Sequence, residues 1–469
     1  MSALPVIVIY ALLMVIFAIY FSKREVKSGE DFMVAGHRLP LIVVIGTLTA
    51  TWVGSGSLIG GAGFVYQKGP MAAAFYFLGA PLGILVMYFI AAKTRLLAKR
   101  TVPEMLEIRF GSLTRLLAAV FILITYISVL SYQFIAGGYI LHITTGLPEQ
   151  TGSFLTVLLV IVLACTGGLF SVSYTDVISA FIIVFGFILA IPFILSEVGG
   201  FTGLAASLPD QQSTWTGGLT LAQLIGYLLP MFIYIIGDQN LLQRFSASKD
   251  EKVAKKSTIG FFIGVLSIYS LITLLATSAI VLLPSIKPDT ALIEIASQVL
   301  PLSVGSIILA AFTALLVTTA NSFLLSMSGN AVYDLYGRFK GELNERQYLK
   351  ISRIFVVLIG IVAYFLGTFF TSVLELSVFA FTMYGAALTP VILAGFFWKR
   401  ATTAGAIACI LTGGIATIIW QAMGKPFGWN AVLISLPLSI LALVFVSLIT
   451  GNKQNSYPTE LTGNEELAK

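Results

Sequence analysis

The sequence has few of the residues on which soluble enzymes and secreted proteins depend. Charged residues make up 10% of the 469 residues, and the chain has two histidines and two cysteines. A soluble domain contains about 25% charged residues. Both cysteines, Cys165 and Cys409, lie in apolar stretches, so no disulfide framework is indicated. Because 58% of the residues are hydrophobic, we expect an all-α polytopic membrane protein that contacts the lipid bilayer along most of its length.

The sequence also lacks the short motifs that mark common active sites. It contains no CxxC, HExxH, P-loop or GxGxxG pattern, and no paired carboxylates or Ser/His/Asp set that would indicate catalysis. We therefore expect neither an enzyme nor an ATP-driven pump. We also expect no nucleic-acid partner and no obligate protein partner.

Thirteen apolar segments can be drawn, each about long enough to span a bilayer as a helix. Their approximate bounds are 3–21, 40–66, 70–92, 113–144, 150–169, 173–196, 219–242, 257–284, 302–334, 351–370, 373–398, 403–422 and 430–449. With the N-terminus outside, 24 of the 27 Lys and Arg residues fall in cytoplasmic loops, and only Lys68, Lys287 and Lys425 lie outside. Positive charge favours cytoplasmic loops. The sequence thus predicts a multi-pass cell-membrane protein with an outside N-terminus and a cytoplasmic tail at 452–469.

The second apolar segment contains a concentration of glycine. Within GTLTATWVGSGSLIGGAG, which covers 46–63, glycine stands at 54, 56, 60, 61 and 63. Each glycine in a helix interior costs about 1 kcal/mol, so we expect the helix to break near Ala50 to Ser57. Broken backbone at membrane depth is tolerated where it lines a cavity or binds a ligand. The alternative is a straight helix that uses the glycines as a packing face.

A second interrupted segment comes five spans later. The segment 219–242 contains Gly226, Pro230 and Gly237, and Pro230 removes a backbone donor from its helix. Two interrupted spans at corresponding positions of two five-span halves indicate an inverted repeat with a binding site near the midplane. The alternative for Pro230 is an ordinary kink.

Hydroxyl side chains gather on one face of the segment 302–334. The residues that follow the spacing i, i+3, i+4 and i+7 are Leu315, Thr318, Thr319 and Ser322. Neutral hydroxyl and carbonyl oxygens suit a hard monovalent cation such as Na⁺. Carbonyls released at Ala50 and Val53 would complete such a site. The alternative is that the hydroxyls bond to carbonyls of their own helix or join neighbouring helices.

Few ionisable residues fall within the apolar segments. The main ones are Asp176, Asp238 and Glu375, and each lies near a predicted segment end. A deep charge in a membrane protein indicates ion or solute handling. Asp176 has the alternative role of capping the N-terminus of its helix. We interpret Asp238 as a partner of Arg244 or as a backbone ligand at the membrane exit, and Glu375 as an exterior structural residue.

Four stretches of the chain resemble the sodium:solute symporter family, which includes proline, pantothenate, sialic acid and sodium/galactose symporters. These stretches are DFMVAGHRLP…ATWVGSGSLIGGAG, GGLFSVSYTDVI, GDQNLLQRFSASKDEKVAKKS and TPVILAGFFWKRATTAGAIA. The likeness runs from about Met1 to Ile449. It implies the LeuT-like fold, with 13 transmembrane helices and inverted five-helix repeats.

The resemblance also implies how the chain is divided. It implies a single transporter domain at 1–451, with the first repeat at 40–196 and the second at 219–398. An extra helix at 3–21 precedes the repeats, and two more helices at 403–449 follow them.

Sodium ligands follow from the same resemblance. The shared sodium site would use the carbonyls of Ala50, Val53 and Leu315 and the hydroxyls of Thr318 and Thr319. Some members bind a second sodium ion, for which the matching residues are Asp176, Asn321 and Ser322. Asn321 departs from the serine or aspartate of those members, although its amide oxygen can still bind a cation.

The solute pocket implied by the resemblance lies between the interrupted spans and their neighbours. Its candidate residues are Ser55, Ser57, Gln133, Phe232, Tyr234 and Tyr384. Tyr234 matches an aromatic gate in sugar-carrying members. Ser57 replaces a glutamine and Met231 an asparagine of the galactose-binding set. An amino acid, a carboxylate or a pantothenate-like compound is therefore favoured over a hexose.

The resemblance implies secondary active transport, in which Na⁺ moves inward and carries a small organic solute with it by alternating access. Two alternatives are open at the level of the sequence. One is a proton-coupled carrier of the same fold in which Asp176 titrates, and the other is a membrane sensor that binds a solute without moving it. Sodium dependence of uptake at fixed pH separates the first alternative from sodium symport.

Overall fold

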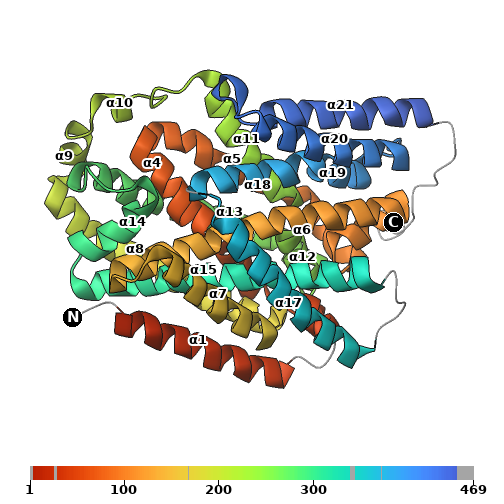
Figure 1. The fold of residues 1–469 in the computed structure, drawn as a ribbon, viewed down its shortest axis with the longest axis horizontal. Coiled ribbons are helices and arrows are strands. Elements are labelled where there is room, and N and C mark those ends of the chain that lie inside the picture. The colour runs from red at the N-terminus through yellow and green to blue at the C-terminus, as the bar shows by residue number, and fades with distance from the viewer. Residues whose placement is uncertain (1–3, 26–28, 167, 338–343, 371, 452–469) are drawn as a thin grey trace.

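The chain forms a bundle of long helices that lie roughly side by side in the computed structural model (Figure 1). The structure describes residues 4–25, 29–166, 168–337, 344–370 and 372–451. The helices are α1 (Leu4–Glu25), α2 (Gly29–Val34), η1 (Ala35–His37), α3 (Leu41–Trp52), η2 (Gly56–Gly61), α4 (Ala62–Lys68), α5 (Pro70–Leu97), α6 (Val102–Thr145), α7 (Glu149–Thr166), α8 (Leu169–Val198), α9 (Gly200–Ala206), α10 (Asp210–Ser213), α11 (Leu221–Gly237), α12 (Gln239–Ala247), α13 (Glu251–Leu282), η3 (Pro288–Thr290), α14 (Ala291–Glu294), η4 (Ile295–Val299), α15 (Leu302–Gly329), η5 (Asn330–Tyr336), α17 (Glu345–Gly367), α18 (Val373–Ala387), α19 (Thr389–Phe397), α20 (Thr403–Ala422), η6 (Pro426–Gly428) and α21 (Val432–Thr450). The tail predicted at 452–469 lies outside the described residues.

The number of membrane spans agrees in outline with the apolar segments. Among the described residues, ten helices are long and apolar enough to cross a membrane, and the bent pair of α3 with η2 and α4 makes an eleventh span. Two shorter apolar helices, within α1 and α7, coincide with the first and fifth predicted segments. The multi-pass architecture is confirmed, whereas the count of thirteen spans stays a prediction.

The outer faces of the bundle are apolar. Phe181 on α8 is 72% exposed and Leu441 on α21 is 63% exposed. Large exposed apolar surfaces are rare on soluble monomers and mark contact with a membrane or a partner. In a chain with so many spanning helices, lipid is the expected neighbour of these side chains.

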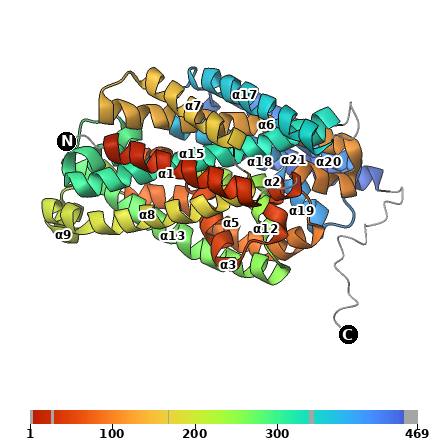
Figure 2. The same cartoon turned by 90° about the horizontal axis from the view of Figure 1, so that it is seen from below.

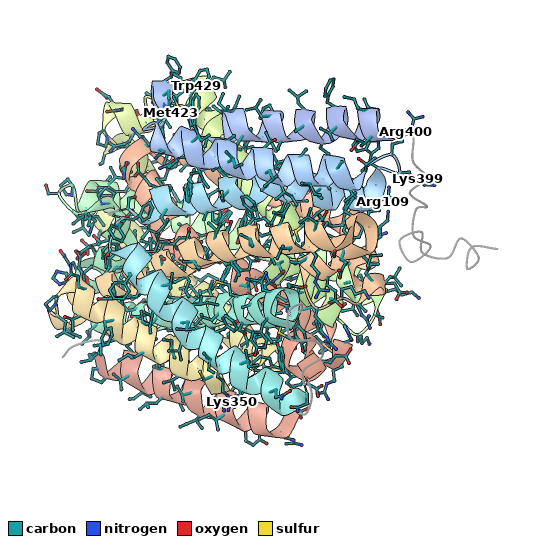
Figure 3. All side chains as sticks on the ribbon, turned by 45° about the vertical axis from the view of Figure 1, so that its right-hand side comes forward. Arg109, Lys350, Lys399, Arg400, Met423 and Trp429 are labelled. Carbon is teal, nitrogen blue, oxygen red and sulfur yellow. The ribbon has the colours of Figure 1, made fainter. Side chains whose placement is uncertain are left out.

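Basic residues gather at one end of the helices. Figure 3 shows Arg109, Lys399 and Arg400 together at one end of the bundle, with Met423 and Trp429 at the opposite end. This separation is the one that the loop charges predict. The orientation of the chain relative to the cell stays a prediction.

The helices α15 and α18 form the interior of the bundle. In the most apolar stretch of each span, 83% of the residues are buried in α18 and α19 and 78% in α15 and η5. The same share is 28% in α21. Figure 2 shows α1 lying along the outside of α15 and α8, and it packs against both. The polar residues of α15 are therefore shielded from lipid by the helices around them.

Glycines let α5 approach α11 closely. A Cβ atom at Gly79 would lie 2.4 Å from the backbone oxygen of Leu228, and a Cβ atom at Gly83 would lie 2.2 Å from Cγ2 of Ile235. The first contact involves backbone, so only a shift of a whole helix relieves it. Gly79 and Gly83 are four residues apart and share a helix face. Membrane helices commonly pack through small residues in this way.

We expect Gly79→Leu to lower the thermal midpoint of the purified protein, because the added side chain has to displace α11. Overpacking of this kind costs about 1–3 kcal/mol. Leu85→Ala is the matched control on the same helix, since Leu85 is 52% exposed on the outer face. If both variants melted like the wild type, the close packing of α5 on α11 would be wrong.

Candidate functional site

The first broken span releases two backbone carbonyls. The helix α3 and the segment formed by η2 and α4 meet at 55°. In a continuous helix the Gly54 N–H would bond to the Ala50 carbonyl, but here it donates to the Trp52 carbonyl at 3.0 Å. The Ser57 N–H donates to the Gly54 carbonyl at 3.1 Å instead of reaching that of Val53. The predicted break is confirmed, and the alternative of a straight helix is wrong.

One hydroxyl group of α15 contacts a released carbonyl, and two others bond within α15. The Thr319 hydroxyl donates to the Ala50 carbonyl at 3.3 Å, and Thr319 is 1% exposed. The Thr318 hydroxyl donates to the Leu315 carbonyl within α15 at 3.2 Å. The fold thus brings Ala50 and Thr319 into contact across two helices, with Leu315 and Thr318 within one turn of Thr319. Val53 is fully buried at the break itself.

The chemistry of this set is that of neutral oxygen. Among the described residues, no group of three or more His, Cys, Asp or Glu side chains could hold a metal ion. Carbonyl and hydroxyl oxygens suit a hard cation, whereas transition metals favour nitrogen or sulfur ligands. Buried carbonyls that have lost their helical donors are costly in an apolar medium unless they find a new partner. A monovalent cation such as Na⁺ is a partner that these oxygens can bind.

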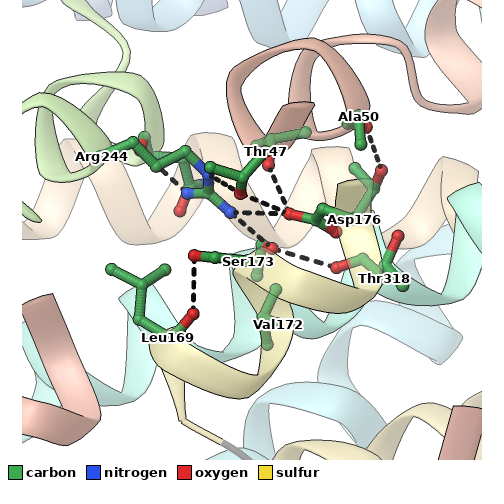
Figure 4. Close-up of polar contacts among 12 residues, drawn as sticks. Thr47, Ala50, Leu169, Val172, Ser173, Asp176, Arg244 and Thr318 are labelled. Carbon is green, nitrogen blue, oxygen red and sulfur yellow. Dashed lines mark hydrogen bonds and ion pairs between the residues drawn. The ribbon is translucent and has the colours of Figure 1, made fainter. Parts of the chain in front are cut away.

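A fully buried ion pair lies beside these oxygens (Figure 4). Nη2 of Arg244 on α12 is 3.5 Å from Oδ2 of Asp176 on α8, and both side chains are 0% exposed. The Thr47 hydroxyl bridges the pair, because it donates to Asp176 at 2.6 Å and accepts from Nε of Arg244 at 2.9 Å. Ser322 accepts from Nη2 of Arg244 at 2.9 Å and donates to the Thr318 carbonyl at 3.0 Å. The protein itself therefore compensates the charge of Asp176.

The structure corrects two interpretations of the acidic residues. Asp176 does not cap its helix, because α8 begins at Leu169 and Asp176 lies about two turns inside it. The ion pair of Arg244 is made with Asp176, not with Asp238. Glu375 lies 3.2 Å from Nζ of Lys425 and is exposed, which fits the exterior position expected for it.

The second interrupted span breaks at Asp238, between α11 and α12, while its proline lies inside α11. Two tyrosines bind the N–H groups of the first two residues of α12. Tyr384 accepts from the first and Tyr126 from the second, both at 3.1 Å. Tyr384 also donates to the Gly237 carbonyl at 2.7 Å, which is the last carbonyl of α11. The break is thus held by side chains from α6 and α18.

A small cavity lies between the two breaks. Its aromatic wall consists of Trp52, Tyr132, Tyr234, Phe323 and Phe381. Its polar lining includes Ser57, Gln133, Asp238 and Thr319. The space measures about 20 Å³, which is room for about one water molecule. Because Thr319 both lines the cavity and bonds to Ala50, the cavity adjoins the oxygen set described above.

Three of the six predicted solute residues line this cavity, namely Ser57, Gln133 and Tyr234. Ser55 lies behind the lining and donates to Oε1 of Gln133 at 2.6 Å. Tyr384 supports the second break instead of lining the cavity. Phe232 lies on the side of α11 that packs on α5. Asn321, predicted for a second sodium ion, is buried on α15 next to Ser322.

Sequence reasoning did not predict a binding role for five of the six aromatic or acidic residues that line the cavity. These are Trp52, Tyr132, Asp238, Phe323 and Phe381. Trp52 and Asp238 each adjoin a break in a span, and that position is a signal in the sequence. The other three come from α6, α15 and α18, where the direction that an aromatic ring faces depends on how the helices pack.

Residues 32–413 match the sodium:solute symporter family. The chain belongs to this family. Members of the family are transporters rather than enzymes, and sodium is the coupling ion. This family assignment agrees with the neutral oxygen set at the break in the first span.

The similar proteins extend over nearly the whole chain. The high-affinity proline transporter PutP of Bacillus subtilis (strain 168) is 26% identical over 453 residues, which cover 92% of this chain and 95% of that protein. Sodium/proline symporter 2 of Staphylococcus saprophyticus is 26% identical over 484 residues, which cover 97% of this chain and 94% of that protein.

Solved structures show the fold. A Na⁺-coupled sialic acid symporter in a substrate-bound outward-open state has a TM-score of 0.80 at 22% identity, covering 95% of this chain and 98% of that one. The nucleobase-cation-symport-1 transporter Mhp1 has a TM-score of 0.62 at 12% identity. The match covers 93% of this chain and 98% of that one. These neighbours are LeuT-fold transporters. The division of this chain into two inverted repeats stays a prediction.

We expect Asp176→Leu to destabilise the protein strongly, because it leaves the Arg244 guanidinium buried without its counter-charge. Removal of one partner from a buried ion pair costs about 3–5 kcal/mol. The double variant, Asp176→Leu with Arg244→Met, should recover part of the loss in thermal midpoint. Losses that simply add in the double variant would show that the two side chains do not interact.

Proposed function

We propose that this protein imports a small amino acid together with Na⁺ across the cell membrane by alternating access, with proline as the first solute to test. The observation that carries the proposal is the broken span whose Ala50 carbonyl meets the Thr319 hydroxyl at the wall of an aromatic cavity. The relatives that are named as proline transporters support the choice of solute. The outside N-terminus and the cytoplasmic C-terminus are part of the same proposal.

Sodium would bind between α3 and α15. Its ligands would be the carbonyls of Ala50, Val53 and Leu315 and the hydroxyls of Thr318 and Thr319. One positive charge that crosses 100 mV releases about 2.3 kcal/mol, and about 1.4 kcal/mol corresponds to a tenfold ratio of concentrations. The membrane potential acting on one Na⁺ can therefore sustain a solute gradient on the order of tens-fold.

Sodium binding would raise the affinity for the solute because it fixes the position of the cavity wall. Sodium would hold the unwound residues after α3 against α15, and this contact places Gly54 and Thr319 at the cavity. Thermodynamic linkage requires the solute to raise the affinity for sodium by the same factor. A cavity of about 20 Å³ has to widen before it admits a solute. Helix movement is therefore part of the transport cycle.

The lining of the cavity favours a small, partly apolar solute over a hexose. Five aromatic side chains form its wall, and five shorter polar side chains lie among them, namely Thr51, Ser57, Gln133, Asp238 and Thr319. A sugar would bury several hydroxyl groups against this wall, and each buried hydroxyl without a partner costs binding energy. An amino acid with an apolar side chain can place that part against the rings.

The buried ion pair supports coupling to one sodium ion per solute. A second site at Asp176, Asn321 and Ser322 would use a carboxylate that Arg244 already neutralises at 3.5 Å. Ser322 also accepts a hydrogen bond from the same guanidinium. A second Na⁺ would have to compete with Arg244 for Oδ2 of Asp176 and for the Ser322 hydroxyl, whereas Oδ1 of Asp176 makes no hydrogen bond among the described residues.

Purified protein in proteoliposomes should accumulate radiolabelled L-proline under an inward Na⁺ gradient, because sodium supplies the driving force. Uptake should fall to background when K⁺ replaces Na⁺ at fixed pH, and an imposed proton gradient should not restore it. The Na⁺-to-proline flux ratio in the same vesicles is expected to be about one, as one occupied sodium site requires. Uptake that is indifferent to sodium would rule out the proposal, and pantothenate and glucose serve as competing solutes.

We expect Thr319→Ala to lower the apparent affinity for Na⁺ about tenfold, or about 1.4 kcal/mol, because it removes a hydroxyl ligand. Thr313→Ala is the matched control, since the Thr313 hydroxyl donates to the Leu309 carbonyl of its own helix at 2.9 Å. The rise of the thermal midpoint with Na⁺ concentration measures this affinity without transport. An unchanged Na⁺ titration of Thr319→Ala would remove Thr319 from the site.

A further inference from the structure

The cavity between the two breaks contains a carboxylate that the sodium site does not use. Asp238 is the one acidic residue among the described side chains that line the cavity, and it is 1% exposed. A buried carboxylate in a membrane protein is expensive unless it is paired or binds an ion or a solute. The proposed sodium ligands on α3 and α15 do not include it.

Helix capping does not account for this carboxylate. Asp238 stands at the N-cap position of α12, but its side chain makes no capping hydrogen bond. The first two N–H groups of α12 are bound by Tyr384 and Tyr126 instead. Oδ1 of Asp238 accepts a hydrogen bond from the Tyr126 hydroxyl. The helix N-terminus favours a negative charge at this position, and the Asn240 N–H lies near the carboxylate, but the hydrogen bonds of the first two N–H groups go to the two tyrosines.

The buried arginine does not compensate Asp238 by direct contact. The contacts of the Arg244 guanidinium go to Asp176, Thr47, Asn240 and Ser322. Arg244 and Asp176 cancel each other's charge, so Asp238 brings an additional negative charge to this fully buried region. Sodium at the proposed ligands would balance the total charge, but it would bind oxygens of other residues. The side of the Asp238 carboxylate that faces the cavity can therefore bind a cation or a hydrogen-bond donor of a ligand.

Aromatic rings line the cavity next to this carboxylate. The rings of Tyr234 and Phe381 are stacked with centroids 4.6 Å apart, and Trp52 lies 5.7 Å from Tyr234. The Tyr234 hydroxyl lies near Asp238 and, among the described residues, has no hydrogen-bond partner of ordinary geometry. Faces of aromatic rings attract cations. By excluding water, the rings also strengthen the attraction between a cation and the carboxylate.

We propose that Asp238, together with the rings of Trp52 and Tyr234, binds the positively charged nitrogen of the transported solute. This inference rests on the proposed function and names the residues that recognise the charge of the solute. The solutes are amino acids and other compounds with a protonated or quaternary nitrogen. Hexoses, pantothenate and plain carboxylates have no such nitrogen. The apolar part of the solute lies against the aromatic wall.

Analogue binding to the wild-type protein tests the role of the charge, with Na⁺ present throughout. Tetrahydrofuran-2-carboxylate has the ring and the carboxylate of L-proline but carries an oxygen in place of the charged nitrogen. We expect it to bind about tenfold to a hundredfold more weakly than L-proline in isothermal titration, because a charge-assisted hydrogen bond is lost. Equal binding of the two compounds would overturn the inference.

The variant Asp238→Asn tests which residue senses the charge. It removes the charge and nearly keeps the side-chain shape, so the affinity ratio between L-proline and the oxygen analogue should fall at least about tenfold. The thermal midpoint should still rise with Na⁺. Asp289→Asn is the matched control, because Asp289 is also buried but accepts from the Val373 N–H at 2.9 Å outside the cavity.

The outcomes for the inference and for the proposed function differ. An affinity ratio in Asp238→Asn equal to that of the wild type would overturn the inference, and if this variant does not fold, the wild-type comparison decides alone. Sodium-dependent transport of glucose or pantothenate would also overturn the inference, while leaving sodium-coupled symport in place. Binding of another cationic solute in place of proline would support the inference and remove proline as the solute.

Discussion

Backbone groups inside a bilayer have no water to bond with, so a helix that breaks at membrane depth has to supply its released groups with other partners. The first broken span frees the carbonyls of Ala50 and Val53, and the Thr319 hydroxyl donates to the first of them. A sodium ion offers these oxygens a stronger interaction than a single hydroxyl does. The proposed coupling site would therefore arise from the same shortage of partners that makes broken helices rare in membranes.

At the second break, side chains bind the backbone groups that the helix releases. Tyr384 and Tyr126 bind the exposed N–H groups at the start of α12, and Tyr384 also donates to the last carbonyl of α11. Because two tyrosines satisfy this helix end, the carboxylate of Asp238 can face the cavity. The two breaks thus place electronegative oxygens at two sides of one small space, because the Ala50 carbonyl adjoins it through Thr319 and the Asp238 carboxylate lines it. Both features favour positively charged ligands.

The location of the spans was predictable because long apolar segments are a property of the chain itself. The predicted segment 70–92 corresponds to α5 at Pro70–Leu97, and 403–422 corresponds to α20 at Thr403–Ala422. The break near Ala50 was predictable for a similar reason, since glycine weakens a helix wherever it stands. Pro230 was a poorer guide, because a helix can kink at proline without ending. The second break lies at Asp238, where α11 stops.

The sequence alone determined the membrane architecture, the first broken span and the hydroxyl face of α15, because each depends on local composition or on helical spacing. Only the tertiary structure decided that Arg244 pairs with Asp176 and that Asp238 lines the cavity. Both carboxylates are compatible with Arg244 in the linear sequence. The choice depends on how α3, α8 and α12 pack, and that packing joins residues that are far apart along the chain.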